Sequence, residues 1–407
     1  KESMKVLLIN ITLERGSTGK IVAGIKKKVE DSNDNAYVAY GFYNSNLSNS
    51  YKIKCDGKVV VCYELLRIKL TGYHGYTSKR ATQKLIKKVK EINPDIINMH
   101  NIHSGYLNLP MWFSFLKEYG KPIVWTLHDC WAFTGHCAHY SALQCTKWKE
   151  GCYNCENRDA YPGKSLIERS KEQWLDKRNI FTSLENMVLV TPSNWLRNEV
   201  KQSFLSQYSV RVIQNGIDLC IFRYRETDIR KRLKIEEKKV VLGVAMSWSA
   251  RKGLDVFLSL DKLLDENYRI LLVGLKENYK LPKETKIIPI SRTLDQCELA
   301  GIYSASDFFV NPSLEETLGM TTVEAMACGT PAIVYNQTAV PEPVGENCGI
   351  ILEENSPEEI KKAIKILENS NVDFRTTCRK HVEKHFNKEV CYMKYIELYR
   401  EMLEDRL

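Results

Sequence analysis

Short apolar runs recur along the whole chain, and amphipathic helical patterns separate them. The runs are four to six residues long, which is the length of buried strands rather than of helices. They are Val6–Ile11, Asn35–Tyr40, Ile96–His100, Ile123–Leu127 and Met187–Thr191 in the first half, and Val210–Gln214, Val240–Val244, Ile270–Val273, Lys286–Ile290, Phe308–Asn311 and Ala332–Tyr335 in the second. Strand-sized runs that alternate with helical patterns predict parallel sheets covered by helices, the α/β class.

The two series of strands predict two domains. A chain of 407 residues is long enough for two, because a domain typically takes about 150 residues. We place the first domain at 4–190 and the second at 191–387, with the join between Thr191 and Val210. Tyr392, Tyr395 and Leu398 have helical spacing, and we expect 388–407 to pack back on the first domain.

The net charge of +9 is concentrated in the first half of the chain. Residues 1–200 hold 29 Lys and Arg against 19 Asp and Glu. Much of the excess lies at 67–69 and in the basic amphipathic pattern of 79–90. This pattern is typical of a solvated helix and also of a helix that contacts an anionic membrane or a lipid-diphosphate acceptor. No reader motif accompanies it, so nucleic acid is not an expected partner.

From the sequence we expect neither a membrane span nor a signal peptide. No apolar run reaches the roughly 18 residues that a spanning helix needs, and the first apolar segment has the length of a strand. We therefore expect a cytoplasmic chain that, at most, touches the inner face of a membrane through its basic segment.

Ligands of parallel sheets gather at the carboxyl ends of the strands, so the residues there are candidates for a site. Gly16-Ser17-Thr18-Gly19 follows the first strand but matches neither the Walker pattern nor the dinucleotide fingerprint. It is either a turn that lets a ligand approach the backbone or a structural turn. His128 follows Ile123–Leu127, where a histidine is either a core residue or a functional one. Asn215-Gly216 has the chemistry of a turn.

Arg251 and Lys252 follow another predicted strand and precede Gly253. Two cations beside the start of a helix can neutralise a diphosphate leaving group, as a metal ion would otherwise do.

Glu316 and Glu324 flank a glycine-containing turn after Phe308–Asn311. The residues after Thr321 predict a short helix, whose N-terminal N–H groups suit an anionic ligand such as a diphosphate. A carboxylate in that helix can accept hydrogen bonds from sugar hydroxyls. Two glutamates at this spacing are by themselves also typical of a solvated helix face.

These segments together, in this order, resemble the family 4 retaining glycosyltransferases. The set comprises Gly16–Gly19, His128-Asp129, Thr191-Pro192-Ser193, Asn215-Gly216-Ile217-Asp218, Arg251-Lys252-Gly253, Tyr303–Asp307 and the segment from Glu316 to Pro331. The resemblance covers nearly the whole chain. It implies the GT-B fold, in which two Rossmann-like α/β domains with parallel sheets face each other across a cleft.

The resemblance also implies roles for individual residues. Glu324 holds the ribose of a nucleotide sugar, Glu316 lies near the donor sugar, and His128 contacts that sugar near the reacting carbon. Lys252 matches the diphosphate lysine. The remaining donor-binding residues are Gly16, Gly19, Asn215 and the backbone of Gly319, Met320 and Thr321. One departure is Ser247, where the family usually has an arginine, and we expect Arg251 to supply the missing charge.

The implied activity is transfer of a sugar from a nucleotide-diphosphate sugar to an acceptor hydroxyl, with retention of configuration. A UDP-sugar is the first expectation and a GDP-sugar the second, and the acceptor is a bacterial polysaccharide or lipid-linked glycan. No D-x-D motif is present, so no cofactor is expected for catalysis. The alternatives are another enzyme on this fold, such as a sugar-nucleotide epimerase or a phosphorylase, and a non-catalytic sugar-nucleotide-binding subunit.

Four of the thirteen cysteines are grouped just after His128. Cys137, Cys145, Cys152 and Cys155 include a C-x-x-C pair and have the ligand types of a structural zinc site. Ordinary thiols and disulfides are the alternatives, and His136 or His139 could replace one sulfur.

Overall fold

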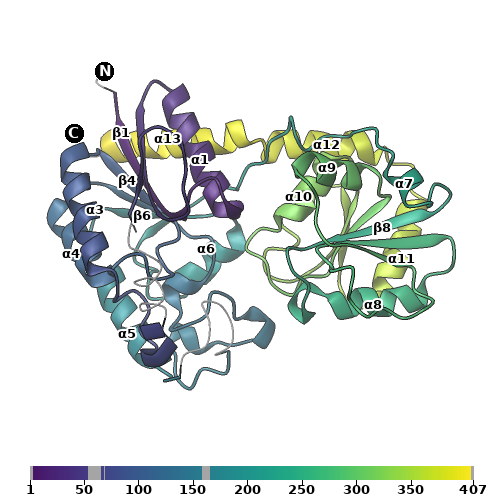
Figure 1. Cartoon of the computed structure of the whole chain (residues 1–407), viewed down its shortest axis with the longest axis horizontal. Coiled ribbons are helices and arrows are strands. Elements are labelled where there is room, and N and C mark those ends of the chain that lie inside the picture. The colour runs from purple at the N-terminus through teal and green to yellow at the C-terminus, as the bar shows by residue number, and fades with distance from the viewer. Residues whose placement is uncertain (1–2, 54–65, 68, 158–165, 405–407) are drawn as a thin grey trace. The chain divides into compact units, whose positions relative to one another are not determined.

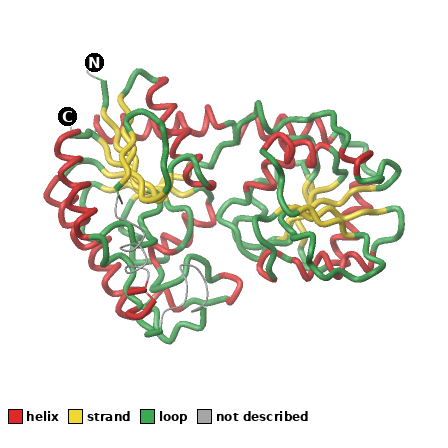
Figure 2. Tube along the Cα trace, in the orientation of Figure 1, coloured by secondary structure: helices red, strands yellow, loops and turns green. Residues whose placement is uncertain are grey.

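The computed structural model describes residues 3–53, 66–67, 69–157 and 166–404. Ile68 of the first basic segment and the last three residues of the 388–407 tail lie outside the described residues. The described chain divides into two compact units, 1–213 with 392–407 and 214–391. Each unit contains one sheet (Figures 1 and 2).

The first unit is built on a seven-stranded parallel sheet with the order β3-β2-β1-β4-β5-β6-β7. Apolar runs form its central strands, and the short polar β3 closes one edge. The strands are β1 (Lys5–Thr12), β2 (Asn35–Phe42), β3 (Ser50–Lys52), β4 (Ile96–Met99), β5 (Ile123–Thr126), β6 (Met187–Thr191) and β7 (Ser209–Val212). β1 pairs with both β2 and β4, so the strand order reverses between β1 and β4.

Helices cover both faces of this sheet (Figure 1). They are α1 (Gly16–Asp31), α3 (Lys79–Ile92), α4 (Leu109–Tyr119), α5 (Ser170–Phe181), α6 (Asn194–Lys201) and α13 (Lys388–Glu404). Buried side chains of α3, α4 and α5 share one apolar core with the sheet. On the other face the Tyr399 hydroxyl receives a hydrogen bond of 2.5 Å from Asn98 of β4, which ties α13 to this sheet.

The second unit contains a six-stranded parallel sheet with the order β10-β9-β8-β11-β12-β13. Its strands are β8 (Lys239–Val244), β9 (Tyr268–Val273), β10 (Ile287–Ile290), β11 (Phe308–Asn311), β12 (Ala332–Tyr335) and β13 (Gly349–Leu352). Pro289 is accommodated because β10 is an edge strand and needs fewer backbone donors. Here the strand order reverses between β8 and β11.

Two apolar cores sandwich this second sheet. One contains side chains of α9 (Gln296–Ser304), α10 (Met320–Ala327) and α12 (Phe374–His385), together with Ile229 of the short α7 (Ile229–Arg232). The other contains side chains of α8 (Leu254–Leu263) and α11 (Pro357–Glu368). Figure 1 shows α9, α10 and α12 on one side of the sheet and α8 on the other.

The two parallel sheets covered by helices confirm the predicted α/β class, and all eleven predicted strands are present. Two edge strands, β3 and β13, were not predicted, because β3 is polar and β13 has no clear flanking signal. The run at Val210 was assigned to the second series of strands, but it forms β7 and pairs with β6 in the first sheet. The units therefore divide after Ile213, whereas the sequence interpretation placed the join at 190/191.

Candidate active site

Glu316 and the two cations lie on the loops that leave β8 and β11, and Glu324 lies on α10, the helix that follows the second loop. β8 and β11 are the neighbouring strands at which the order of the second sheet reverses, which is where open α/β sheets bind their ligands. After β8 the chain forms a short 3-10 turn, Ala250–Lys252, that ends at Gly253. Gly253 has a φ of 76°, and a Cβ there would lie 2.9 Å from the carbonyl oxygen of Pro312. The glycine therefore lets the two loops meet.

Lys252 and Glu316 form an ion pair across these loops. The residues are 64 positions apart in sequence, and their side chains are only 24% and 21% exposed. The Thr338 hydroxyl bonds to both the backbone N–H and the carbonyl of Glu316, at 3.0 Å each. The structure thus places a partly buried cation beside a carboxylate, where a bound anion would meet little competing solvent.

Arg251 is held by the backbone of the facing loop. Its Nη1 donates to the carbonyl oxygen of Glu315 at 3.2 Å, and its own carbonyl accepts from Leu314 N–H at 3.0 Å. Ser247 is exposed in the same loop after β8. Arg251 is therefore a fixed cation next to Lys252.

The helix α10 begins directly after the loop that carries Glu316. Gly319 precedes it with a φ of 82°, and no side chain among the described residues caps the helix. The first N–H groups of α10 are therefore the donors that an anionic ligand can use. Gly319, Met320 and Thr321, which were predicted to donate backbone N–H groups, form the start of this helix.

Glu324 lies on α10 and receives a hydrogen bond from the buried Tyr303 of α9. The Tyr303 Oη to Glu324 Oε2 distance is 3.0 Å. Burial, together with the Glu324 charge, raises the pKa of Tyr303 well above its usual range, so the phenol keeps its proton. Tyr303 therefore holds one carboxylate oxygen of Glu324 in a fixed position.

His128 of the first unit lies at the end of β5 and belongs to a small cluster of histidines. Its Nε2 lies 2.9 Å from Nδ1 of His100, which follows β4. Burial lowers the pKa of His128 to about 4, so the ring is neutral at pH 7. Beside this pair, His103 Nε2 lies 3.1 Å from Asp129 Oδ2. The arrangement provides a neutral imidazole of fixed orientation at a strand end.

The other predicted donor-binding residues occupy two different places. Gly16 and Gly19 lie in the first turn of α1 rather than in a turn before it. A Cβ at Gly19 would lie 2.8 Å from Thr12 Oγ1, so close packing favours glycine there. Asn215 is a buried residue of the second unit. Its neighbour Gly216 packs against the backbone of Lys388, which leaves no room for a Cβ. Close packing is therefore one reason for glycine in this turn.

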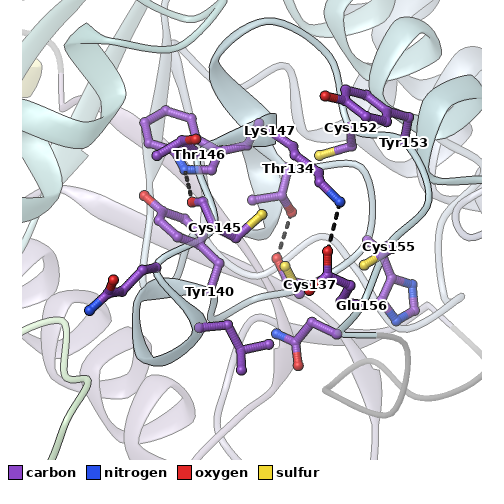
Figure 3. Close-up of a pocket in the computed structure, with 15 residues that line it drawn as sticks. Thr134, Cys137, Tyr140, Cys145, Thr146, Lys147, Cys152, Tyr153, Cys155 and Glu156 are labelled. Carbon is purple, nitrogen blue, oxygen red and sulfur yellow. Dashed lines mark hydrogen bonds and ion pairs between the residues drawn. The ribbon is translucent and has the colours of Figure 1, made fainter.

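The four grouped cysteines line one pocket of about 210 Å³ in the loop after β5 (Figure 3). Gly135 N–H lies 3.0 Å from Cys152 Sγ and donates to it. Burial raises the pKa of Cys137 to about 12 and that of Cys152 to about 11. The thiols are thus protonated as they stand. Among the residues that the structure describes, no three His, Cys, Asp or Glu side chains are placed to hold a metal ion.

Two residues that support the site, Tyr303 and His100, were not predicted to do so. Tyr303 was noted only as part of a motif, and no local signal links it to Glu324 across 21 residues. His100 is the last residue of the predicted strand Ile96–His100. Its position at a strand end, like that of His128, is a signal that could have identified it.

The fold indicates the class of this protein, and comparison with known proteins shows its family. Two parallel sheets, each covered by helices, are the arrangement of the GT-B-fold glycosyltransferases. Residues 59–220 match the family described as Glycosyltransferase Family 4, and residues 225–385 match Glycosyl transferases group 1. The chain therefore belongs to the group 1, family 4 glycosyltransferases.

The similar proteins are distant relatives. The putative colanic acid biosynthesis glycosyl transferase WcaC of Escherichia coli is 25% identical over 53% of this chain and 55% of its own. A GDP-mannose-dependent phosphatidylinositol dimannoside mannosyltransferase of Mycobacterium tuberculosis is 24% identical over 55% of this chain and 60% of its own. The chain thus spans somewhat more than half the length of each.

A solved structure shows that the likeness in fold extends over the whole chain. HepE from Anabaena, in complex with UDP, superposes with a TM-score of 0.67 at 15% identity and covers 98% of this chain and 100% of its own. In the described part of this chain, no helix is both long and apolar enough to cross a membrane.

Proposed function

We propose that this chain is a retaining glycosyltransferase that moves a sugar from a nucleotide-diphosphate sugar to an acceptor hydroxyl. The observation that carries the proposal is the pairing of Lys252 with Glu316 beside the uncapped N-terminus of α10. A fixed cation and free backbone donors at one strand-end site suit a diphosphate, and carboxylates suit the hydroxyls of a sugar and a ribose. Membership of a glycosyltransferase family supports the same reaction class.

Each residue has a distinct task in this proposal. Glu324, held by Tyr303, accepts hydrogen bonds from the ribose, and Glu316 orients the donor sugar. Lys252 and Arg251 stabilise the negative charge that develops on the leaving diphosphate. The backbone of Gly319, Met320 and Thr321 donates to phosphate or sugar oxygens.

His128 contacts the donor sugar near the reacting carbon as a neutral ring, because burial keeps its pKa near 4. Gly16 and Gly19 allow the donor to approach the first turn of α1, and Asn215 contributes to donor binding from the second unit. Departure of the leaving group and attack by the acceptor take place on the same face of the sugar, which retains the configuration. The reaction needs no divalent metal, so activity should survive EDTA.

The donor is a UDP-sugar in this proposal, with a GDP-sugar as the second candidate. The fold-level match to HepE, whose structure contains UDP, supports the first, and the match to a mannosyltransferase named for GDP-mannose supports the second. The acceptor is a polysaccharide or lipid-linked glycan, an inference supported by the similarity to WcaC.

Two accessory features complete the proposal. In this proposal the basic side chains of α3 contact an anionic membrane surface. Four of them face solvent and are available for this contact, namely Lys79, Arg80, Lys84 and Lys87. The pocket lined by Cys137, Cys145, Cys152 and Cys155 holds a structural zinc ion. The shared pocket and the N–H donated to Cys152 support this site, and binding requires the buried thiols of Cys137 and Cys152 to lose their protons.

A thermal-shift screen against a panel of sugar nucleotides tests the donor. The expected result is stabilisation by one nucleotide class, because a ligand that binds only the folded state raises its stability. Product analysis with the stabilising donor then separates the activities. Transfer to an acceptor supports the proposal, epimerised donor without a glycosylated product supports an epimerase, and binding without turnover supports a non-catalytic subunit.

A further inference from the structure

His100 is a fully buried histidine that stands behind His128. The two residues follow β4 and β5, which are neighbours in the first sheet. Their rings are nearly parallel, with 16° between the planes and 5.2 Å between the centroids, and His100 Nδ1 lies 2.9 Å from His128 Nε2. His100 itself is only 1% exposed.

Neighbouring strands hold His100 in place through its backbone. Its N–H donates to the carbonyl oxygen of Ile9 at 2.8 Å, and its carbonyl accepts from Trp125 Nε1 at 3.1 Å. The ring of His100 is therefore attached to the sheet rather than to the loop that follows β5. Any hydrogen bond that it makes to His128 orients the His128 ring relative to this rigid scaffold.

Both rings are neutral, so one must donate and the other accept. Burial, with a smaller contribution from His128, lowers the pKa of His100 well below its usual value, and His128 has a pKa of about 4. Among the described residues, His100 Nε2 is buried and has no hydrogen-bond partner. A proton on that nitrogen would be a buried donor without an acceptor, which is rarer in folded proteins than an acceptor without a donor.

We propose that His100 is a positioning residue, whose Nδ1–H donates to His128 Nε2 and holds His128 in the tautomer protonated at Nδ1. The cavity shared by His100, His128, His103 and Asp129 measures only about 10 Å³, the space of about one water molecule. A sugar cannot enter it, so His100 acts through His128. The consequence for catalysis rests on the proposed function: His128 meets the donor sugar as a neutral ring of fixed orientation.

The tautomer can be measured without any substrate. In the full chain labelled with ¹⁵N-histidine, two-bond ¹H–¹⁵N correlation at pH 7.5 identifies which nitrogen of each ring carries the proton, and a His128→Asn spectrum assigns His128. The expected result is a protonated Nδ1 and a bare Nε2 on His128. A proton on Nε2 of His128 would overturn the proposal, whether or not the protein has activity.

Two variants of His100 separate positioning from packing. The amide nitrogen of Asn stands where His Nδ1 stands, so His100→Asn should keep the His128 tautomer, whereas His100→Leu removes the donor and should change it. With the donor found by the thermal-shift screen, we expect kcat to fall about tenfold or more in the Leu variant, with a smaller change in KM, and to recover in the Asn variant. An unchanged tautomer in His100→Leu contradicts the inference.

The outcomes distinguish this inference from the proposed function. If the wild-type chain has the expected tautomer but turns over no sugar nucleotide, the proposed function fails and the hydrogen bond stands. If the wild-type tautomer is the opposite one while turnover is normal, the inference fails and the proposed function stands. A Leu variant that does not fold leaves both the wild-type spectrum and the Asn variant as tests.

Discussion

At the scale of single residues, Lys252 and Arg251 have similar charges but different surroundings. Lys252 is paired with a side chain, Glu316, whereas the Arg251 guanidinium donates to a backbone carbonyl. The loss of Lys252 therefore removes a positive charge from the site. The loss of Arg251 also removes a contact between two loops.

We predict that Lys252→Ala reduces turnover of the donor by about 100-fold, the usual effect of removing one group that stabilises transition-state charge. Arg251→Ala should lower both turnover and donor affinity. The control is Lys262→Ala, an exposed lysine at the end of α8, which removes the same charge outside the site. Initial rates and donor-dependent thermal shifts measure these effects. Unchanged donor affinity and turnover in Arg251→Ala would show that Arg251 does not replace the arginine absent at Ser247.

At the scale of single elements, α3 has a sharply divided surface. Ala81, Leu85 and Val89 are buried against the first sheet, whereas Lys84, Lys87 and Lys90 are exposed. The apolar face is thus already used by the fold. Only electrostatic attraction is left to hold this helix on a membrane, so binding must weaken with salt.

Replacing Lys84 and Lys87 by Gln should weaken co-sedimentation with anionic vesicles roughly tenfold or more, since each basic residue near such a surface contributes about 1 kcal/mol. The matched control replaces two exposed lysines of the second unit, Lys231 and Lys361, and should bind as the wild type does. Binding that is equal for neutral and anionic vesicles, or insensitive to salt, would rule out this role for α3.

Between β5 and α5, the described residues 127–157 and 166–169 form three 3-10 turns and no α-helix or strand. If a metal fastens this loop, purified protein contains about one zinc equivalent, and a strong chelator lowers the melting temperature. Cys152→Ser with Cys155→Ser should lose the metal, whereas Cys297→Ser, an exposed cysteine of the second unit, should keep it. Less than about a tenth of an equivalent in the wild type would leave these residues as ordinary thiols.

At the scale of the whole molecule, acid should destabilise the first unit. His74, His100 and His128 of the first unit are neutral when folded, because burial lowers the pKa of His74 to about 3 and that of His128 to about 4. Unfolded histidines bind a proton below about pH 6.5. The unfolded state therefore holds more protons between pH 6.5 and 4. The stability of the first unit is complete above this range and is lost as the pH falls through it.

The loss can reach about 1.4 kcal/mol per pH unit for each histidine. Urea unfolding at pH 7.5, 6 and 5 measures it through tryptophan fluorescence, because six of the seven tryptophans lie in the first unit. In His74→Gln one of the titrating groups is absent, so the fall should be shallower. A midpoint that does not change between pH 7.5 and 5 would contradict the prediction.

The sequence by itself determined the features that depend on local pattern. Buried parallel strands are continuous apolar runs, so their order along the chain, the α/β class and the strand-end position of Glu316, Lys252 and His128 could be predicted. The ordered motifs extended this to the glycosyltransferase family. Two strands were missed, because β3 is short and polar and β13 has no clear flanking signal.

Only the tertiary structure decided which of these residues meet. Local periodicity does not determine the order of strands in a sheet. The sequence therefore could not show that Ser209–Val212 joins the first sheet or that β8 lies beside β11. That second fact brings Lys252 to Glu316. In the same way, the pairing of β4 with β5 brings His100 to His128, and the packing of α9 on α10 brings Tyr303 to Glu324. Local pattern thus predicted the candidates, and long-range packing determined how they are held.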